Sequence, residues 1–291
     1  MRLALKIDVD TLCGTEEGVP RLARLLDKHR AGGTFLFSLG PDHTGRALRR
    51  IFRPGFFAKV NRTSVLEHYG VRTLLYGTLL PGPDIGRRCA DAMRTVRDAG
   101  FEVGVHCWDH VRWQDFVAAR DAVWTEREMD LACARFTEVF GAAPRTWGAA
   151  GWQTNVHAAR YQQRFDYASD TRGFQPFQPV WHGRPLGCPQ VPTTLPTLDE
   201  LIGRQADVVQ HLLGLTRERV RDHVFTAHAE LEGGKLMPMF EALVAGWQAQ
   251  GYELVPTRDI PRTLLPRHEV VYGEVPGRSG TLALQGKEVR P

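Results

Sequence analysis

The stretch LALKIDVD, residues 3–10, decides the fold of this chain. Its first five residues form a short, mainly apolar run that ends in Asp8, Val9 and Asp10. A run of this length is typical of a buried strand. Acids that directly follow a buried strand cost free energy unless they are paired or bound to a metal. The stretch therefore predicts a buried strand whose carboxyl end presents two acids.

Similar apolar segments recur along the chain and alternate with helical patterns. Strand signals are clear at 34–38, 101–105, 223–227 and 252–255, and weaker at 145–148, 165–168 and 189–191. Helical spacing covers residues 18–30, 84–99, 120–140, 207–221 and 238–250. This alternation predicts an α/β fold with a parallel sheet, open or closed into a barrel. Barrel enzymes carry their active sites at the carboxyl ends of the strands.

Length and composition are those of a globular protein. The chain has 291 residues, of which 43% are hydrophobic and 24% charged, enough for one barrel-sized domain or two small ones. The formal net charge of +4 is too small for a nucleic-acid-binding tail, so we expect no nucleic-acid partner. The basic residues are mostly arginine, which favours bidentate contacts to phosphate or carboxylate, although a GC-rich genome produces the same bias.

The cysteines and the N-terminal residues bear on the compartment. Five cysteines without a CxxC pair argue against a disulfide framework and favour a reducing compartment. The first ten residues already carry charge, unlike a signal peptide, and no apolar run reaches the roughly 18 residues of a membrane span. We therefore expect a cytoplasmic protein, with peripheral membrane contact left open.

The segment HCWDH, residues 106–110, contains two histidines four positions apart. At that spacing His106 and His110 would lie on one face of a helical turn and could share a metal ion. The spacing alone is a weak signal, because a chain with 11 histidines also forms such pairs by chance. The apolar strand and glycine before it place the pair at a strand end, which strengthens the metal hypothesis. Cys107, between the histidines, is a less favoured ligand.

Asp8 and Asp10 complete this hypothesis. Two carboxylates so close together repel each other, which raises one pKa unless a cation intervenes. A metal ion would resolve the repulsion if one carboxylate ligates it and the other accepts a proton from water. The alternative is a pair of acids that cap a helix beginning near Thr11. Two histidines and one carboxylate leave coordination positions open, as catalytic sites do, and suit zinc, manganese, cobalt, nickel or iron.

His228 is the candidate general acid. It ends the apolar strand of the segment FTAHAE, and a histidine pKa suits proton donation near neutral pH. Taken alone, such a histidine is more often a hydrogen-bonded core residue. The chain has no GxSxG elbow, P-loop or GxGxxG segment after a strand that would indicate another chemistry.

Residues 41–83 do not fit the alternation of strands and helices. The segment is too long for a simple connection, and it combines arginines and aromatic residues with the phrases RPG and LLPGPD. Arginines among exposed aromatic side chains would suit a membrane interface with anionic head groups. The alternative is a helical insertion with an aromatic core and solvated arginines.

With these residues assembled, the chain resembles the polysaccharide deacetylase (NodB-homology) family. The match covers the strand-ending DVD, the HxxxH and the late strand-ending histidine, in that order, across roughly residues 1–260. Longer phrases resemble the members that remove a formyl group from a lipid-linked amino sugar. These phrases are KIDVDTLCGTEEGVPRL, FSLGPD, EVGVHCWDH, AAGWQ, SDTRG, TLPTLDELIGR and HAELEG.

The resemblance implies a deformed (β/α) barrel with seven or eight strands and a role for each matched residue. Asp8 would be the base, and Asp10, His106 and His110 would hold one divalent metal ion. His228 would be the acid, and Asp170 of SDTRG would orient it, unless Asp170 is an ordinary turn aspartate. The implied domain division is a catalytic barrel over 1–265 with the 41–83 insertion as a lid or membrane-facing element. Residues 266–291 would be a C-terminal extension.

The chain departs from the family at one motif. Typical members carry an Arg-x-Pro motif after the metal histidines, and its arginine is thought to steady the base. The corresponding residues here are GAAGW, 148–152, without an arginine. Arg172 could supply the charge from another strand, a hypothesis that rests on its place beside Asp170.

The implied substrate is a formamido sugar on undecaprenyl phosphate, and its deformylation would give the amino sugar lipid used in lipid A modification. The protein would bind this substrate on the cytoplasmic face of the inner membrane. A formyl group is small, so its pocket should be tight. Candidate walls are Trp108, Trp152 and the segment that contains Thr193 and Thr194, with core packing as the alternative for each tryptophan. No protein partner is expected. The rival hypotheses are another N-acyl amino-sugar deacetylase, a non-catalytic lipid- or glycan-binding barrel, and a metal-storage role, which the open coordination argues against.

Overall fold

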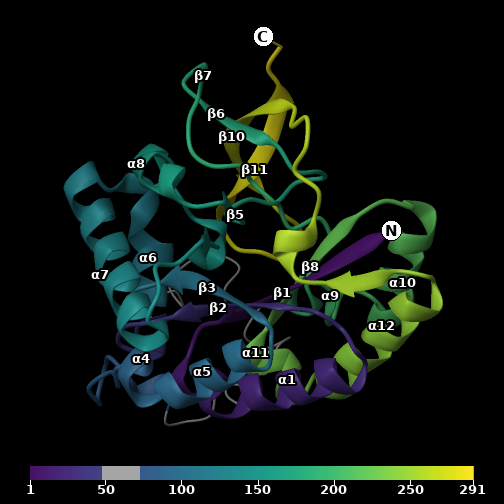
Figure 1. Cartoon of the computed structure of the whole chain (residues 1–291), viewed down its shortest axis with the longest axis horizontal. Coiled ribbons are helices and arrows are strands. Elements are labelled where there is room, and N and C mark those ends of the chain that lie inside the picture. The colour runs from purple at the N-terminus through teal and green to yellow at the C-terminus, as the bar shows by residue number, and fades with distance from the viewer. Residues whose placement is uncertain (48–72, 291) are drawn as a thin grey trace.

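The computed structural model describes residues 1–47 and 73–290 of the chain (Figure 1). Residues 48–72, which hold most of the predicted 41–83 insertion with its arginines and aromatic side chains, lie outside the described residues.

Seven parallel strands form the main sheet. Its path runs in the order β5-β4-β3-β2-β1-β8, and β9 also pairs with β1. The bounds are β1 (Arg2–Val9), β2 (Thr34–Ser38), β3 (Glu102–Cys107), β4 (Thr146–Trp147), β5 (Tyr167–Ala168), β8 (His223–His228) and β9 (Glu253–Val255). The α/β fold with a parallel sheet is thus confirmed, and β1 pairs with β2, β8 and β9.

Helices surround the strands on several sides in Figure 1. The α-helices are α1 (Val19–Lys28), α4 (Ile85–Arg88), α5 (Ala90–Asp98), α6 (His110–Phe116), α7 (Ala122–Phe140), α8 (Val156–Tyr161), α9 (Leu198–Leu201), α10 (Val208–Glu218), α11 (Ala229–Glu232) and α12 (Met237–Ala249). A π-helix, η1 (Gly14–Gly18), precedes α1, and short 3-10 turns include η4 (Ala150–Trp152). The helix expected over 84–99 is divided at Cys89 into α4 and α5.

The two faces of β1 have different surroundings. Leu3, Leu5, Ile7 and Val9 belong to the large hydrophobic core that includes the helices. Ala4 belongs to a smaller cluster, contributed by strands on opposite sides of the sheet and their flanks: Tyr167, Val191, Val224, Val255 and Ile260. Because side chains alternate along a strand, the face with Ala4 also carries Lys6 and Asp8 into the space that the strands enclose.

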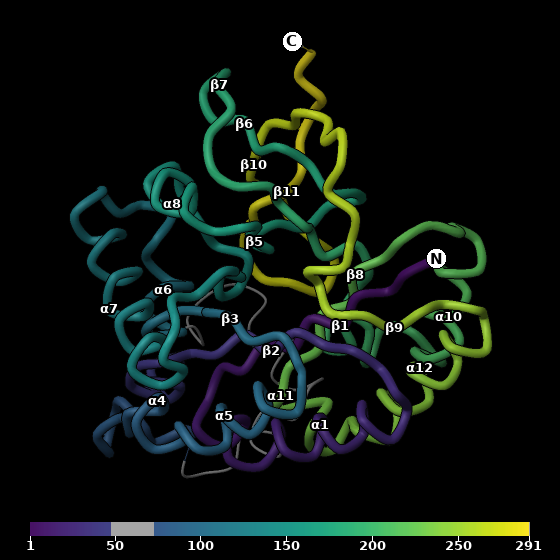
Figure 2. Tube along the Cα trace, viewed as in Figure 1, coloured from purple at the N-terminus to yellow at the C-terminus, as the bar shows by residue number. Residues whose placement is uncertain are grey.

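The segment 189–195 closes the sheet between β5 and β8. On one side, Val191 N–H donates to Ala168 O over 2.8 Å; on the other, Thr194 N–H donates to Val224 O over 3.0 Å. The weak strand signal at 189–191 therefore belongs to the extended segment that joins β5 to β8 and closes the sheet into a deformed barrel. Figure 2 shows how β1, at the start of the chain, lies beside β8 and β9 from near its end.

A second, four-stranded sheet lies beside the barrel. Its order is β11-β10-β6-β7, with β6 (Gln178–Trp181), β7 (Arg184–Pro185), β10 (Arg267–Glu274) and β11 (Thr281–Glu288). The tail, which shows no clear periodicity in sequence, thus forms two strands. They join the barrel where Arg172 N–H donates to Ala283 O and Gln285 N–H donates to Arg172 O, over 2.9 and 2.8 Å. The division into a barrel and a separate extension stays a prediction.

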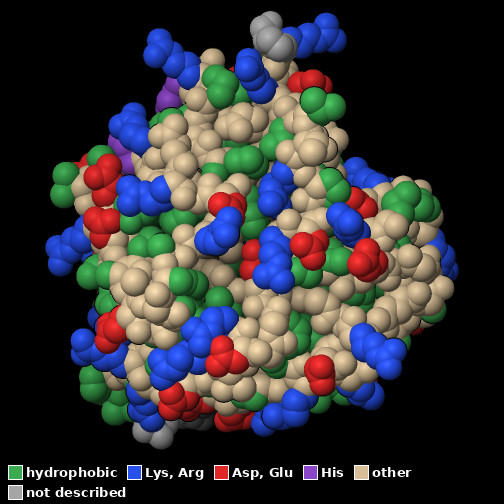
Figure 3. Space-filling model, in the orientation of Figure 1, with side chains coloured by type: hydrophobic (Ala, Val, Ile, Leu, Met, Phe, Trp, Pro, Cys, Tyr) green, Lys and Arg blue, Asp and Glu red, His purple; other side chains and the backbone are tan. Residues whose placement is uncertain are grey.

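Basic and acidic side chains are interspersed on the face of the molecule shown in Figure 3. Within residues 1–47 and 73–290, the structure contains no helix long and apolar enough to cross a bilayer.

Gly104 offers a test of the barrel packing. A Cβ there would lie 2.5 Å from Thr146 Cγ2 and 2.7 Å from Leu36 Cδ2, so Gly104→Ala should lower the free energy of unfolding by about 1–3 kcal/mol through overpacking. Gly214→Ala is the control, because a Cβ on that face of α10 meets nothing within 4 Å and removing a helical glycine should stabilise by about 0.5–1 kcal/mol. Urea unfolding measures both; an unchanged Gly104→Ala variant would contradict this packing.

Candidate metal centre and active site

Asp10, His106 and His110 come together at the carboxyl ends of β1 and β3. Asp10 follows β1, His106 lies within β3, and His110 is the first residue of α6, whose N-cap Asp109 accepts a hydrogen bond from Arg112 N–H. The expectation that both histidines share a helical turn is therefore wrong. A strand end and a short turn bring their rings together instead, at a centroid distance of 5.4 Å.

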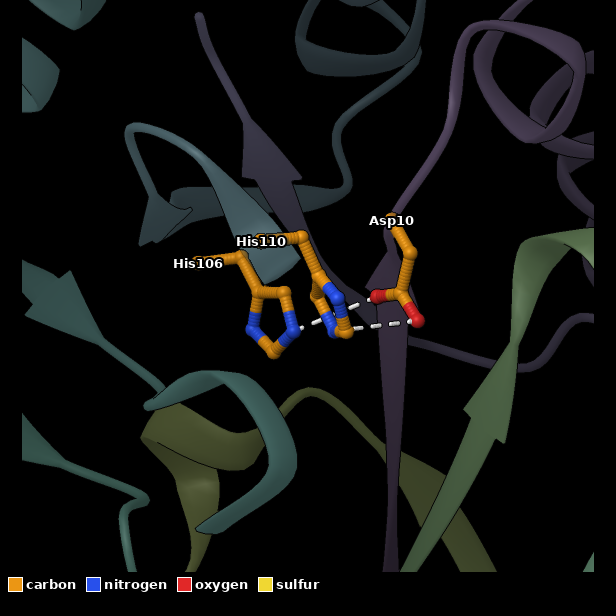
Figure 4. Close-up of side chains that lie close together, drawn as sticks. All are labelled: Asp10, His106 and His110. Carbon is orange, nitrogen blue, oxygen red and sulfur yellow. Dashed lines mark ion pairs between the residues drawn. The ribbon is translucent and has the colours of Figure 1, made fainter. Parts of the chain in front are cut away.

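The two imidazoles face one carboxylate (Figure 4). His106 Nε2 lies 3.2 Å from Asp10 Oδ1, and His110 Nε2 lies 3.2 Å from Asp10 Oδ2. One potential ligand atom from each residue lies within 4.8 Å of the others. No other such group of three occurs in the part of the chain that the structure describes.

The donor set fits a divalent metal ion. His106 Nδ1 lies 2.6 Å from Gly148 O, so an Nδ1–H donated there leaves Nε2 free to ligate. Burial works to raise the pKa of Asp10, but His110 and His106 outweigh it and hold that pKa well below its usual value. An ionised carboxylate and two imidazoles with further positions open make up a catalytic type of site rather than a closed structural one.

Asp8 has a cationic neighbour that the sequence reasoning missed. Lys6 Nζ lies 3.3 Å from Asp8 Oδ2 and donates to Ser169 O over 3.3 Å, and both charged side chains are almost completely buried. Gly148 leaves room for it, since a Cβ there would lie 3.2 Å from Lys6 Cε. The signal in the sequence was a single lysine in an apolar strand, two residues before Asp8 and hence on the same face.

His228 stands directly beside Asp8. The two residues are register partners on the neighbouring parallel strands β1 and β8. The imidazole is 8% exposed, meets the Trp152 ring edge-on at 6.4 Å, and its Nδ1 has no hydrogen-bond partner within the described residues. The acid and base candidates thus lie next to each other, beside the metal candidates.

Asp170 is held elsewhere. Its carboxylate accepts hydrogen bonds from Ala149 N–H over 2.9 Å and from Gln162 Nε2 over 2.8 Å, and burial raises its pKa to about 6. Among the described residues no hydrogen bond joins Asp170 to His228. The described residues thus show other partners for Asp170, and its predicted orienting role toward His228 stays a prediction.

Arg172 also has other partners. Its guanidinium donates to Glu200 Oε1 over 2.5 Å and to Leu195 O over 3.0 Å. Arg278, from the turn between β10 and β11, donates to the same Glu200 oxygen over 2.8 Å. The cation beside Asp8 is therefore Lys6, whereas Arg172 and Arg278 share a carboxylate next to Trp152.

The predicted substrate walls divide into two groups. Trp152 Nε1 donates to Thr193 Oγ1 over 3.2 Å, and this hydroxyl contacts Thr226 Oγ1 at 2.7 Å, so both residues lie in the network beside His228. Thr194 instead contacts His223 Nδ1 at 3.1 Å, at the start of β8. Trp108 packs against Gly40 and lies 5.3 Å from the Arg135 guanidinium.

Two further acids, Glu230 and Glu232, follow His228 in HAELEG and were also missed. Glu232 accepts a hydrogen bond from His228 N–H over 2.7 Å, and Glu230 accepts one from Asp10 N–H over 2.9 Å. Burial is the main cause that raises the pKa of Glu232 to about 8, with the charge of Asp199 adding to it. Their sequence signal was two acids on a short turn directly after the candidate acid.

Comparison with known proteins places this chain beside two curated sequences. "Probable 4-deoxy-4-formamido-L-arabinose-phosphoundecaprenol deformylase ArnD" of Shewanella sediminis is 34% identical over 300 residues, covering 99% of this chain and 96% of the relative. The protein of the same name from Wigglesworthia glossinidia brevipalpis is 29% identical, covering 95% and 100%. No family model matches the chain.

Solved structures agree on the fold. A crystal structure of a provisionally named polysaccharide deacetylase from Mycobacterium smegmatis superposes with a TM-score of 0.60 and covers 94% of each chain at 16% identity. At this identity the likeness concerns the fold alone.

We predict that Asp10→Ala weakens the binding of a divalent ion such as Co²⁺ by at least about 100-fold, more than the 10- to 100-fold typical of outer-shell changes, because it removes the one carboxylate ligand. His182→Ala, in the exposed turn between β6 and β7, is the control and should leave the affinity unchanged. Titration calorimetry measures both. Equal Co²⁺ affinity in the Asp10 variant and the wild type would contradict this ligand assignment.

Glu232 should make stability depend on pH. Its folded-state pKa of about 8 lies above the ordinary 4.5, so between these values the folded chain holds a proton that the unfolded chain has lost. Its contribution therefore falls as pH rises from about 5 to 8, by at most about 1.4 kcal/mol per pH unit. Glu232→Gln cannot titrate, so urea unfolding should show a shallower decline for this variant across that window. Parallel curves for variant and wild type would contradict the raised pKa.

Proposed function

The chain belongs to the polysaccharide deacetylase family, and from this premise we propose that it hydrolyses the formamide of undecaprenyl-phosphate-linked 4-deoxy-4-formamido-L-arabinose. Its similarity to a deformylase makes the chain a hydrolase of a linear amide C–N bond. The products would be formate and the free amino sugar lipid used in lipid A modification. The observation that carries the proposal is the pairing of Asp8 with His228 on adjacent strands, next to the Asp10–His106–His110 group.

Asp8 is the proposed base. It accepts a proton from the water that attacks the formyl carbon, and Lys6, whose Nζ lies 3.3 Å from Asp8 Oδ2, holds it in place. Asp10, His106 and His110 would hold one divalent ion, and such an ion supplies Lewis-acid polarisation of the carbonyl and a lower pKa for bound water.

His228 is the proposed acid. When the C–N bond breaks, its imidazole gives a proton to the departing sugar amine. The oxygen of the attacking water stays on the formyl carbon and leaves as part of formate. Trp152 limits the mobility of the ring from one side. We assign Trp152 and Thr193 to the wall of the acyl pocket next to His228, and Arg172 and Asp170 to support of that wall. Trp108 and Thr194 are proposed as more distant lining residues.

The lipid-phosphate part of the substrate should meet the 41–83 insertion. Leu79 and Leu80, at its described end, are 81% and 38% exposed, as expected for side chains that contact lipid. Arginines of the segment would bind the phosphate bidentately. We propose a cytoplasmic protein that binds peripherally to the inner membrane.

The function is tested by incubating a synthetic formamido-arabinose prenyl phosphate with the protein and defined metal ions and following the mass of the lipid. Loss of the formyl group supports the proposal, and an intact formyl group under every metal refutes it. An N-acetyl analogue run in parallel identifies another N-acyl amino-sugar deacetylase if it reacts faster. Binding of either lipid without turnover would indicate a non-catalytic barrel.

Asp8→Asn and His228→Ala should each lower turnover by roughly 100- to 10,000-fold, because each removes one proton-transfer group. Metal affinity should be retained in both variants, which separates loss of chemistry from loss of the ion. Single-turnover kinetics and metal titration give the two quantities. Full activity in either variant would end the assigned role of that residue.

A further inference from the structure

Glu230 connects the strand of His228 to the loop of Asp10. It lies in α11, directly after β8, and its Oε1 accepts hydrogen bonds from the backbone N–H groups of Asp10 and Thr11 over 2.9 and 2.7 Å. The Thr11 hydroxyl donates to the same oxygen over 2.8 Å. One buried carboxylate oxygen thus binds two consecutive residues that are 220 and 219 positions away in the chain.

These bonds replace a purely local cap. The turn after Thr11 leads into the π-helix η1, and the first N–H groups of a helical segment lack partners within it. Thr11 Oγ1 accepts a hydrogen bond from Gly14 N–H over 2.9 Å, and the Thr11 hydroxyl donates its own hydrogen bond to Glu230 Oε1. Glu230 Oε1 thus accepts three hydrogen bonds, which compensate for part of the cost of burying this side chain.

The approach of Glu230 requires glycine on the facing turn. A Cβ at Gly14 would lie 2.1 Å from Glu230 Oε1, and a Cβ at Gly18 would lie 2.0 Å from Ala229 O. Both ends of η1 therefore touch α11 without side chains between them. The contact is built into the backbone of both segments, so the position of Glu230 is closely defined.

We propose that Glu230 is a positioning residue that fixes Asp10 for metal binding by holding the backbone of residues 10 and 11. The Asp10 carboxylate must face both imidazoles at 3.2 Å, and any shift of its backbone moves it away from at least one. Glu230 also keeps the metal ligands in register with His228, two residues before it. This inference rests on the metal site of the proposed function.

The test is Co²⁺ binding to the full chain, followed by visible absorption and calorimetry. Glu230→Ala should weaken affinity by about 10- to 100-fold, the range typical of outer-shell partners. Glu230→Gln keeps an acceptor oxygen and should recover most of the affinity. Glu241→Ala is the matched control, since that glutamate pairs with Lys28 and His29 on the outside of the molecule and should leave affinity unchanged.

Gly14→Ala supplies a second route to the same contact. Its added Cβ displaces Glu230 Oε1, so it should also weaken Co²⁺ binding, and the double variant Gly14→Ala/Glu230→Ala should lose less than the sum of the two changes. Additive losses would contradict an action through Glu230.

Co²⁺ affinity within twofold of wild type in a folded Glu230→Ala variant overturns the proposal. If that variant does not fold, unchanged affinity in Gly14→Ala overturns it equally. A wild-type chain that binds no Co²⁺ overturns the metal site together with this inference. A chain that binds Co²⁺ with the predicted variant pattern but leaves the formyl group intact refutes the proposed function alone.

Discussion

The contact between Lys6 and Asp8 inside the barrel is the constraint on which the rest of the site depends. Both side chains are buried, at 0% and 3% exposure, where a lone charge would cost several kcal/mol. Each side chain lowers the cost of burying the other, and the Lys6 ammonium group also donates a hydrogen bond to the carbonyl of Ser169. Lys6 thus supplies a cation beside the carboxyl group of Asp8 at the end of β1, in a chain that lacks the family-typical arginine.

β1 organises the site because its side chains alternate between two faces: one face packs into the core, and the other carries the charged residues. The side chains of Leu3, Leu5, Ile7 and Val9 pack into the main core, and the opposite face proceeds from Ala4 through Lys6 to Asp8. The two-residue period cannot be changed without moving the charged face into the core. The stability of the barrel and the placement of the base thus depend on the same eight residues.

The second sheet contributes to the wall beside His228. Arg278 reaches from the turn between β10 and β11 to Glu200, which also binds Arg172, and both guanidinium groups lie within 5.0 Å of the Trp152 ring centre. Burial works to raise the pKa of Glu200, but the two arginines lower it below its ordinary value. Trp152 itself has a φ of +52°, a conformation that surrounding contacts must maintain. The last strands of the chain therefore help to hold a residue that contacts the proposed acid.

By itself the sequence determined the alternation of strands and helices, the carboxyl-end rim, and the grouping of Asp10 with His106 and His110, because strand periodicity and metal-ligand chemistry are local properties. Only the tertiary structure decided that Lys6 rather than Arg172 meets Asp8, that Asp170 binds Ala149 and Gln162 rather than His228, and that Glu230 holds the Asp10 loop. These pairings join residues up to 220 positions apart. Lys6 is close to Asp8 in the chain, whereas the contact of Glu230 with the Asp10 loop depends on the close approach that two glycines of η1 allow, which no local pattern in the chain encodes.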